Sequence, residues 1–157
     1  MKQGRERGVT LLEMMIVAGL IGLMAAITFP ALNSGIDSLR LRSATDGIVS
    51  HLTSALNRTE RRQLATEVAI LRQENVIRFA SADNGYRKEL EMPDGVTITA
   101  VQPEIPGLDP MAPRVFLLHP GGVIPRILIE VTNRRGFKRR VSVDPITGTA
   151  QIERVQQ

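Results

Sequence analysis

The feature that most constrains this chain is a long apolar stretch near its amino end. From Val9 to Leu32 the only charged residue is Glu13. As an α-helix rising about 1.5 Å per residue, this stretch would be roughly 36 Å long, enough to cross a hydrocarbon core of about 30 Å. It also exceeds the roughly 7–15 apolar residues of an ordinary secretory signal. It therefore predicts a single membrane-spanning helix.

The charges in front of this stretch predict its orientation. Lys2, Arg5 and Arg7 precede the apolar residues. Basic residues beside a membrane helix hold that end in the cytoplasm. We therefore expect the remainder of the chain to lie on the far side of the membrane.

Glu13 needs a physical explanation. A carboxylate at the centre of a membrane helix costs about 2.5–3.5 kcal/mol on insertion scales, and less near an end. In one interpretation Glu13 stays hydrated at the headgroups. In the other it pairs with a cation inside the membrane. Because no Lys or Arg occurs between Val9 and Leu39, that cation would be the α-amino group created by a cut before Val9.

The residues around this point resemble a known leader. Gly8, followed by Val9-Thr10-Leu11-Leu12-Glu13 and the apolar run, is similar to the class III leader of type IV pilins and type II secretion pseudopilins. The resemblance implies that a prepilin peptidase removes residues 1–8 and N-methylates Val9, which stands where the family usually has phenylalanine. Glu13 takes the place of the family's glutamate, which serves filament assembly.

Three features of the predicted helix, residues 9–36, concern its packing and shape. Ala18, Gly22 and Ala26 form a small-residue stripe that another helix could approach, although such residues are also common in membrane helices generally. Pro30 removes a helix hydrogen bond, which predicts a bend or a break. By resemblance to pilins, Gly22 and Pro30 delimit the segment where the helix kinks. We expect a break at residues 33–35, after which residues 37–64 continue the membrane helix.

The remaining residues, 37–157, predict one α+β domain. Leu41, Ile48, Leu52 and Leu56 give residues 37–64 the apolar stripe of an amphipathic helix. The closely spaced prolines from Pro103 to Pro113 exclude a regular element there. Four strand-like runs precede these prolines and four follow them. This pattern predicts an antiparallel sheet covering the helix. These runs are residues 67–72, 76–79, 86–92, 96–101, 114–119, 126–132, 137–143 and 149–155.

Parts of this domain are similar to the GspH/FimT group of minor pseudopilins. The similar stretches are LTSALNRTERRQLATEVAIL, HPGGVIPRILIEV and VSVDPITGTAQIERV. The resemblance implies a pilin-like fold, a periplasmic head anchored in the inner membrane, and a hetero-oligomeric filament of pseudopilins or minor pilins. The chain contains no Cys, whereas a major pilin normally closes its C-terminal region with a disulfide.

The sequence thus favours a minor pseudopilin that initiates or caps the pseudopilus of a type II secretion system. Two alternatives stay open. One is a minor pilin of a type IV or DNA-uptake pilus, and the other is a plain single-pass membrane protein without processing. No enzymatic motif is evident, and with His51 and His119 as the only histidines we predict no metal site and no cofactor.

One dense basic cluster remains, on a predicted hairpin. Such a cluster is usually a solvated edge that discourages aggregation. Its functional alternative is contact with the phosphates of DNA, although aromatic residues for base stacking make up only 3% of the chain. The cluster consists of Arg134, Arg135, Lys138, Arg139 and Arg140.

Overall fold

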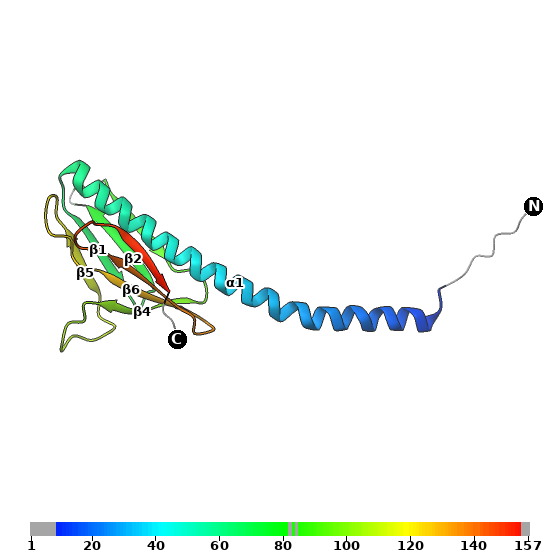
Figure 1. Cartoon of the computed structure of the whole chain (residues 1–157). Helices are drawn as coiled ribbons and strands as arrows, with labels where there is room; N and C mark the ends of the chain where they lie inside the picture. The colour runs from blue at the N-terminus through cyan, green and yellow to red at the C-terminus, as the bar shows by residue number, and fades with distance from the viewer. Residues whose placement is uncertain (1–8, 82, 84, 155–157) are drawn as a thin grey trace, which may run out of the picture. The chain divides into compact units, whose positions relative to one another are not determined.

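The computed structural model describes residues 9–81, 83 and 85–154, with the backbone alone for residues 29–34 and 154. The chain divides into two compact units, Met1–Ile36 and Asp37–Gln157. We call the second unit the head. One long helix, α1 (Leu11–Arg62), contributes to both units (Figure 1).

Helix α1 is unbroken, which confirms that the head helix continues the membrane helix and corrects the expected break. It includes Pro30 and residues 33–35, where we expected a break. Helix propensity is a weak influence compared with the cooperativity of a long helix. The strong helix-forming residues on both sides therefore carry the helix across this stretch.

In the first unit, the apolar side chains of α1 are exposed on every side. Among the described residues, Leu11–Thr28 is the one helical segment long and apolar enough to cross a membrane by length and composition, with a mean hydropathy of 2.2. A helix that is apolar all round needs a core or a membrane to cover it.

In the head, α1 has the predicted amphipathic character. Leu41, Ile48 and Leu52 are buried, and Leu56 packs against the same core. The end of the helix is tied to the first strand, because the hydroxyl of Thr59 donates to that of Thr66 at 2.8 Å. The apolar stripe of α1 thus forms one side of the hydrophobic core.

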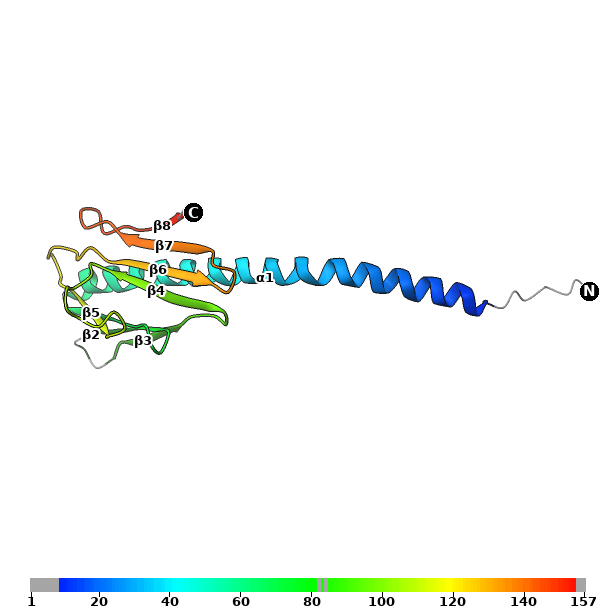
Figure 2. The same ribbon diagram turned by 90° about the horizontal axis from the view of Figure 1, so that it is seen from below.

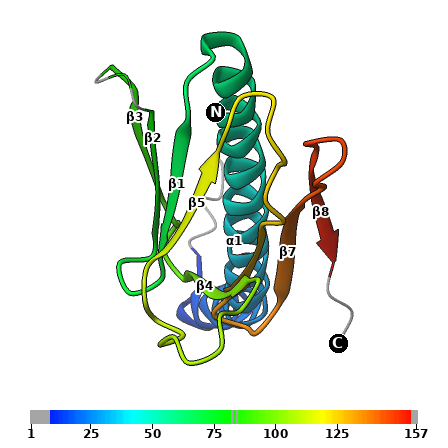
Figure 3. The same ribbon diagram turned by 90° about the vertical axis from the view of Figure 1, so that its left-hand side faces the viewer.

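The head contains two four-stranded antiparallel sheets in place of the single sheet that we expected, although all eight predicted strands are confirmed within a few residues. Figures 2 and 3 show the sheets on either side of the head portion of α1. The first sheet has the order β3-β2-β1-β5 and the second β4-β6-β7-β8. The strands are β1 (Thr66–Leu71), β2 (Val76–Ser81), β3 (Arg87–Glu91), β4 (Val96–Gln102), β5 (Arg114–Leu118), β6 (Leu128–Asn133), β7 (Lys138–Val143) and β8 (Ala150–Arg154).

Side-chain alternation along the strands explains the core. On each strand, every second residue faces the core and the residues between them face outward. Val68 and Ile70 of β1 are buried in this way, as are Ile129 and Val131 of β6. The apolar faces of both sheets pack against the same hydrophobic core. The two sheets therefore cover the head portion of α1 from two sides.

Two side chains after β1 join the sheets by capping the free edge of β4. The amide of Asn75 donates to the carbonyl of Val96 at 2.7 Å and accepts from the amide N–H of Ile98 at 2.9 Å. Arg72 donates to the carbonyl of Thr99 and, at 2.5 Å, to that of Pro110. Strand β4 is bulged between Ile98 and Ala100, so Thr99 lies in the bulge. Backbone groups on the edge of β4 that would otherwise be unpaired thus form hydrogen bonds with the side chains of Arg72 and Asn75.

Candidate assembly segment and basic hairpin

The first turn of α1 is organised by Thr10. The Thr10 hydroxyl accepts a hydrogen bond from the amide N–H of Glu13 at 3.2 Å, so Thr10 is the N-cap of the helix. Thr10 and Glu13 have the T-x-x-E spacing of a capping box, a signal that our sequence analysis missed. A carboxylate in this turn is also stabilised by the helix dipole. Glu13 therefore has a local role in addition to any partner.

The predicted cleavage point adjoins this cap. Gly8 and the rest of residues 1–8 lie outside the described residues, whereas Val9 is described and exposed. In a chain beginning at Val9, the α-amino group would lie one residue before the cap. A cation is unfavourable at the positive end of a helix, and a carboxylate in the same turn would offset that cost.

The predicted packing stripe and kink are only partly described. Ala18, Gly22 and Ala26 are exposed along α1, and a Cβ added at Gly22 would meet no atom within 4 Å. Pro30 lies within α1, and its side chain is outside the described residues. The stripe and the kink stay predictions.

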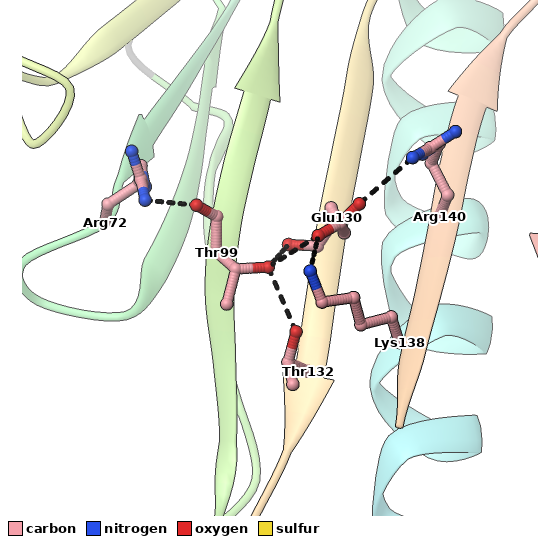
Figure 4. Close-up of polar contacts among 6 residues, drawn as sticks. All are labelled: Arg72, Thr99, Glu130, Thr132, Lys138 and Arg140. Atoms are coloured by element: carbon pink, nitrogen blue, oxygen red, sulfur yellow. Dashed lines mark hydrogen bonds and ion pairs between the residues drawn. The ribbon is translucent and has the colours of Figure 1, made fainter. Parts of the chain in front are cut away.

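The basic cluster is divided by the geometry of β7. Lys138 and Arg140 alternate with Val141, which is buried, so they lie on the outer face of the sheet. Arg139 lies on the opposite face by the same alternation. Both outer cations pair with Glu130 of β6, at 3.1 Å from Lys138 Nζ to Oε1 and 3.1 Å from Arg140 Nη2 to Oε2 (Figure 4). Two of the five charges therefore have an internal counter-ion.

Glu130 is the residue that our sequence analysis missed. It is only 8% exposed and also accepts from the hydroxyl of Thr99 at 3.3 Å. Burial alone would raise the pKa of Glu130, but hydrogen bonds from Lys138, Arg140 and Thr99 outweigh it and hold the pKa below its usual range. Glu130 is directly opposite Arg140 in the strand register, a pairing that the structure shows and the sequence alone does not.

The polar contacts continue from Glu130 into the other sheet. The Thr99 hydroxyl is 3.1 Å from that of Thr132, and the Thr99 carbonyl accepts from Arg72. Figure 4 shows this chain of contacts crossing from Arg72 to Arg140. The network fixes the β4 bulge and the outer face of β6 and β7 together.

Arg134 and Arg135 occupy the turn of the hairpin. The side-chain oxygen of Asn133 accepts from the amide N–H groups of Arg135 at 3.1 Å and Phe137 at 3.0 Å, which shapes this turn. Arg134 lies against Gly95, whose φ is 80°, and a Cβ added there would be 2.6 Å from Arg134 Nε. The structure therefore does not bring the five cations together as one free surface.

Within the described residues, no group of three or more His, Cys, Asp and Glu side chains could hold a metal ion. His51 Nδ1 is 2.9 Å from the carbonyl oxygen of Gly47, and its ring is 5.6 Å from that of Phe79. His51 is thus part of the packing between α1 and the first sheet.

Comparisons with known proteins concern the N-terminal segment and the fold. Residues 3–29 match the prokaryotic N-terminal methylation motif. The structure is similar to that of the minor pseudopilin EpsH from the type 2 secretion system of Vibrio cholerae, with a TM-score of 0.56 and 12% identity, over 73% of this chain and 97% of that one. A comparison with curated sequences found no match. The chain therefore has a prokaryotic N-terminal methylation motif and a fold similar to that of a minor pseudopilin.

Proposed function

We propose that this protein is a minor pseudopilin of a type II secretion system, a structural subunit that initiates or caps the periplasmic pseudopilus. The observation that carries the proposal is the methylation motif at the start of a helix that continues into a head with a minor-pseudopilin fold. A subunit of this kind needs no catalytic centre, because its work is assembly.

Processing and assembly make up the first part of the proposal. The prepilin peptidase cuts after Gly8 and methylates Val9, which leaves Glu13 one turn from the new amine. In the apolar core of a filament, these two charges form a pair, within one chain or between neighbours. In low dielectric such a pair is far stronger than at a surface. Other pseudopilins supply the surrounding helices.

The second part concerns the membrane. Before assembly, residues 9–36 cross the inner membrane and hold the head, residues 37–157, in the periplasm. The exposed apolar side chains of Leu11–Thr28 support this placement, since water is an unfavourable environment for them. The basic residues of the leader support the orientation.

Loss of the gene tests the proposal. We expect a deletion strain to retain its type II substrates in the periplasm, and the wild-type gene to restore secretion. The Gly8→Ala variant should fail to restore it. Normal secretion in the deletion strain, with loss of a surface pilus or of DNA uptake, would overturn the secretion assignment in favour of a minor type IV pilin.

A mobility-shift titration separates DNA uptake from secretion. The full chain in detergent should not retard duplex DNA at physiological salt, because Lys138 and Arg140 share Glu130 as a counter-ion, which cancels one of their two positive charges. Retardation that weakens steeply with salt, and is lost when Arg134, Arg135, Arg139 and Arg140 are changed to Gln, would contradict our assignment.

A further inference from the structure

The end of the head where α1 enters it carries arginines that have no role in the function proposed above. Arg40 of α1 donates to the carbonyl of Asp94, in the turn between β3 and β4, at 3.3 Å. Arg134, in the turn between β6 and β7, lies over Gly95, the next residue of the β3–β4 turn. Three segments that are distant in the sequence therefore meet at this turn. We call Arg40, Arg134 and the adjacent Arg135 the entry arginines.

The entry arginines lie on ordered elements. Figure 2 shows the β3–β4 and β6–β7 turns together at one end of the two sheets, beside the first turns of the head helix, with the β7–β8 turn at the other end. The side-chain oxygen of Asn133 fixes the β6–β7 turn, because it accepts from the amides of Arg135 and Phe137. Arg134 and Arg135 are exposed on this turn. The surface is thus formed by the fold of the head.

The entry arginines have no acidic partner in the head. None of the three forms an ion pair within residues 9–81, 83 and 85–154. The acidic residues beside them are Asp37 and Asp94, so one positive charge is left over. Arg42 is also exposed near this end, but it pairs with Asp46 at 3.7 Å. The surface therefore offers free guanidinium groups and a small positive excess.

The chain that leads into this end indicates what the arginines meet. The apolar stretch ends at Leu32, and Arg40 follows eight residues later in the same continuous helix. Eight residues of α-helix rise about 12 Å. In the function proposed above, the apolar stretch crosses the inner membrane before assembly. The headgroups of that membrane are then close to the entry arginines, whose long side chains can extend toward them.

Apolar side chains accompany the arginines. Leu39 precedes Arg40 and is 67% exposed, and Phe137 follows the arginines of the β6–β7 turn and is 51% exposed. Segments that lie at a membrane surface combine basic and apolar side chains in this way. Duplex DNA would complement the arginines but not the apolar side chains. A separate acidic protein would have to arrive by diffusion, whereas the membrane is held beside the surface by the chain itself.

We propose that, before assembly, the entry arginines bind the phosphate groups of anionic phospholipids in the membrane from which the chain emerges. This inference rests on the membrane part of the proposed function. Guanidinium groups pair with phosphate oxygens through two parallel hydrogen bonds. Because the tether raises the effective concentration of lipid, contacts that are weak individually are sufficient. Entry into the filament then requires these contacts to break.

The full chain, reconstituted in lipid vesicles, provides the test. Because the chain contains no Cys, Phe137→Cys gives a single site for a fluorophore. Ile146→Cys is the matched control, since residue 146 is 90% exposed and lies in the β7–β8 turn at the other end of the head. In vesicles of phosphatidylcholine and phosphatidylglycerol, a phospholipid with a spin label on its headgroup should quench the fluorophore at residue 137. The fluorophore at residue 146 should stay unquenched.

Two double variants test the charge. One arginine near an anionic surface changes the ratio of docked to free heads about fivefold. Changing both Arg134 and Arg135 to Gln should therefore lower this ratio about 25-fold and remove most of the quenching at residue 137. Changing both Arg61 and Arg62 to Gln removes the same charge from exposed residues at the end of α1. This control should leave the quenching unchanged.

Three results would overturn the phosphate contact. The first is equal quenching at residue 137 in vesicles with and without phosphatidylglycerol, which would show proximity through the tether alone. The second is equal quenching in the two double variants. The third is release of the head from the vesicles by duplex DNA at physiological salt, which would assign the entry arginines to nucleic acid.

The inference and the proposed function fail in different ways. A chain that alkaline carbonate strips from the vesicles would contradict the membrane part of the proposed function, and this inference with it. A chain that stays in the vesicles but shows no quenching at residue 137 would contradict the inference alone. The secretion phenotype of the deletion strain decides the proposed function independently.

Discussion

The two units use the same apolar residues in opposite ways. In the first unit, Leu11 is 82% exposed and Ile27 is 70% exposed, whereas in the head Ile48 and Ile129 are 0% exposed. One helix carries both arrangements, since α1 runs from Leu11 to Arg62. The difference teaches that the environment for which a helix is built depends on how its apolar residues are distributed around its axis, and not on their number alone.

In the function proposed above, the first unit depends on processing and assembly, whereas the head depends on its own folding. A variant that affects one unit should therefore leave the other unchanged. The predictions below test that independence, beginning with the largest expected effect.

Gly8→Ala should abolish processing. The added methyl group crowds the peptidase site, so the chain should keep its leader, Met1–Gly8. Intact-mass analysis of membrane-extracted protein measures this directly, because the wild type should be shorter by that leader and carry one methyl group. A wild-type chain that retains Met1 in cells with an active peptidase would contradict the cleavage prediction.

Glu13→Gln should be processed normally but enter filaments poorly. Losing one member of a buried charge pair leaves the other unpaired, at a cost of about 3–5 kcal/mol. Incorporation can be compared with the wild type by immunoblot of sheared pseudopili, with the mass of the mature chain as the processing control. Normal incorporation would show that the carboxylate is simply hydrated.

Ile48→Ala should destabilise the head and leave processing intact. Residues 37–157 should be soluble and folded when expressed alone, because the strands cover the helix stripe. Removing part of the fully buried Ile48 side chain should lower the free energy of unfolding by about 2–5 kcal/mol. Urea denaturation measures the change. Ile146→Ala is the matched control, and an equal effect there would refute the assigned core.

Glu130→Gln should have the smallest effect, a loss of about 1.5 kcal/mol, because its partners Lys138 and Arg140 are partly exposed. Since folding lowers the pKa of Glu130, the carboxylate stabilises the head fully above the unfolded-state pKa of about 4.3. That stability is lost as the pH falls through the lower, folded-state pKa. Unfolding curves between pH 7 and pH 3 should converge for the two proteins, and a constant difference would argue against the charge as the cause.

Local patterns in the sequence predicted the elements better than their pairing. The stripe from Leu41 to Leu56 and the eight strand-like runs depend on residues a few positions apart, and both are confirmed. The division into two sheets was missed because it depends on the distant pairing of β1 with β5 and of β4 with β6. No local pattern in the sequence predicts that Arg72 and Asn75 form hydrogen bonds with the edge of β4.

The candidate sites show the same limit. Gly8, Val9 and Glu13 could be proposed because the motif is contiguous, and they lie within residues 3–29, which match the N-terminal methylation motif. Their roles stay predictions. The basic cluster is contiguous too, but its free charge depends on Glu130, which comes from another strand. Charge counting along a sequence therefore overestimates a basic surface when a neighbouring strand supplies the counter-ion.

The order of the strands has a consequence for how the head unfolds. Successive strands from β3 to β6 alternate between the two sheets, so the chain passes from one sheet to the other three times. The first sheet needs β5, which follows β4 in the sequence, and β4 belongs to the second sheet, where it pairs with β6. Neither sheet is a separable folding unit, because each takes a strand from within the sequence span of the other. We therefore expect one cooperative unfolding transition for the whole head, with a folding rate limited by the two distant pairings.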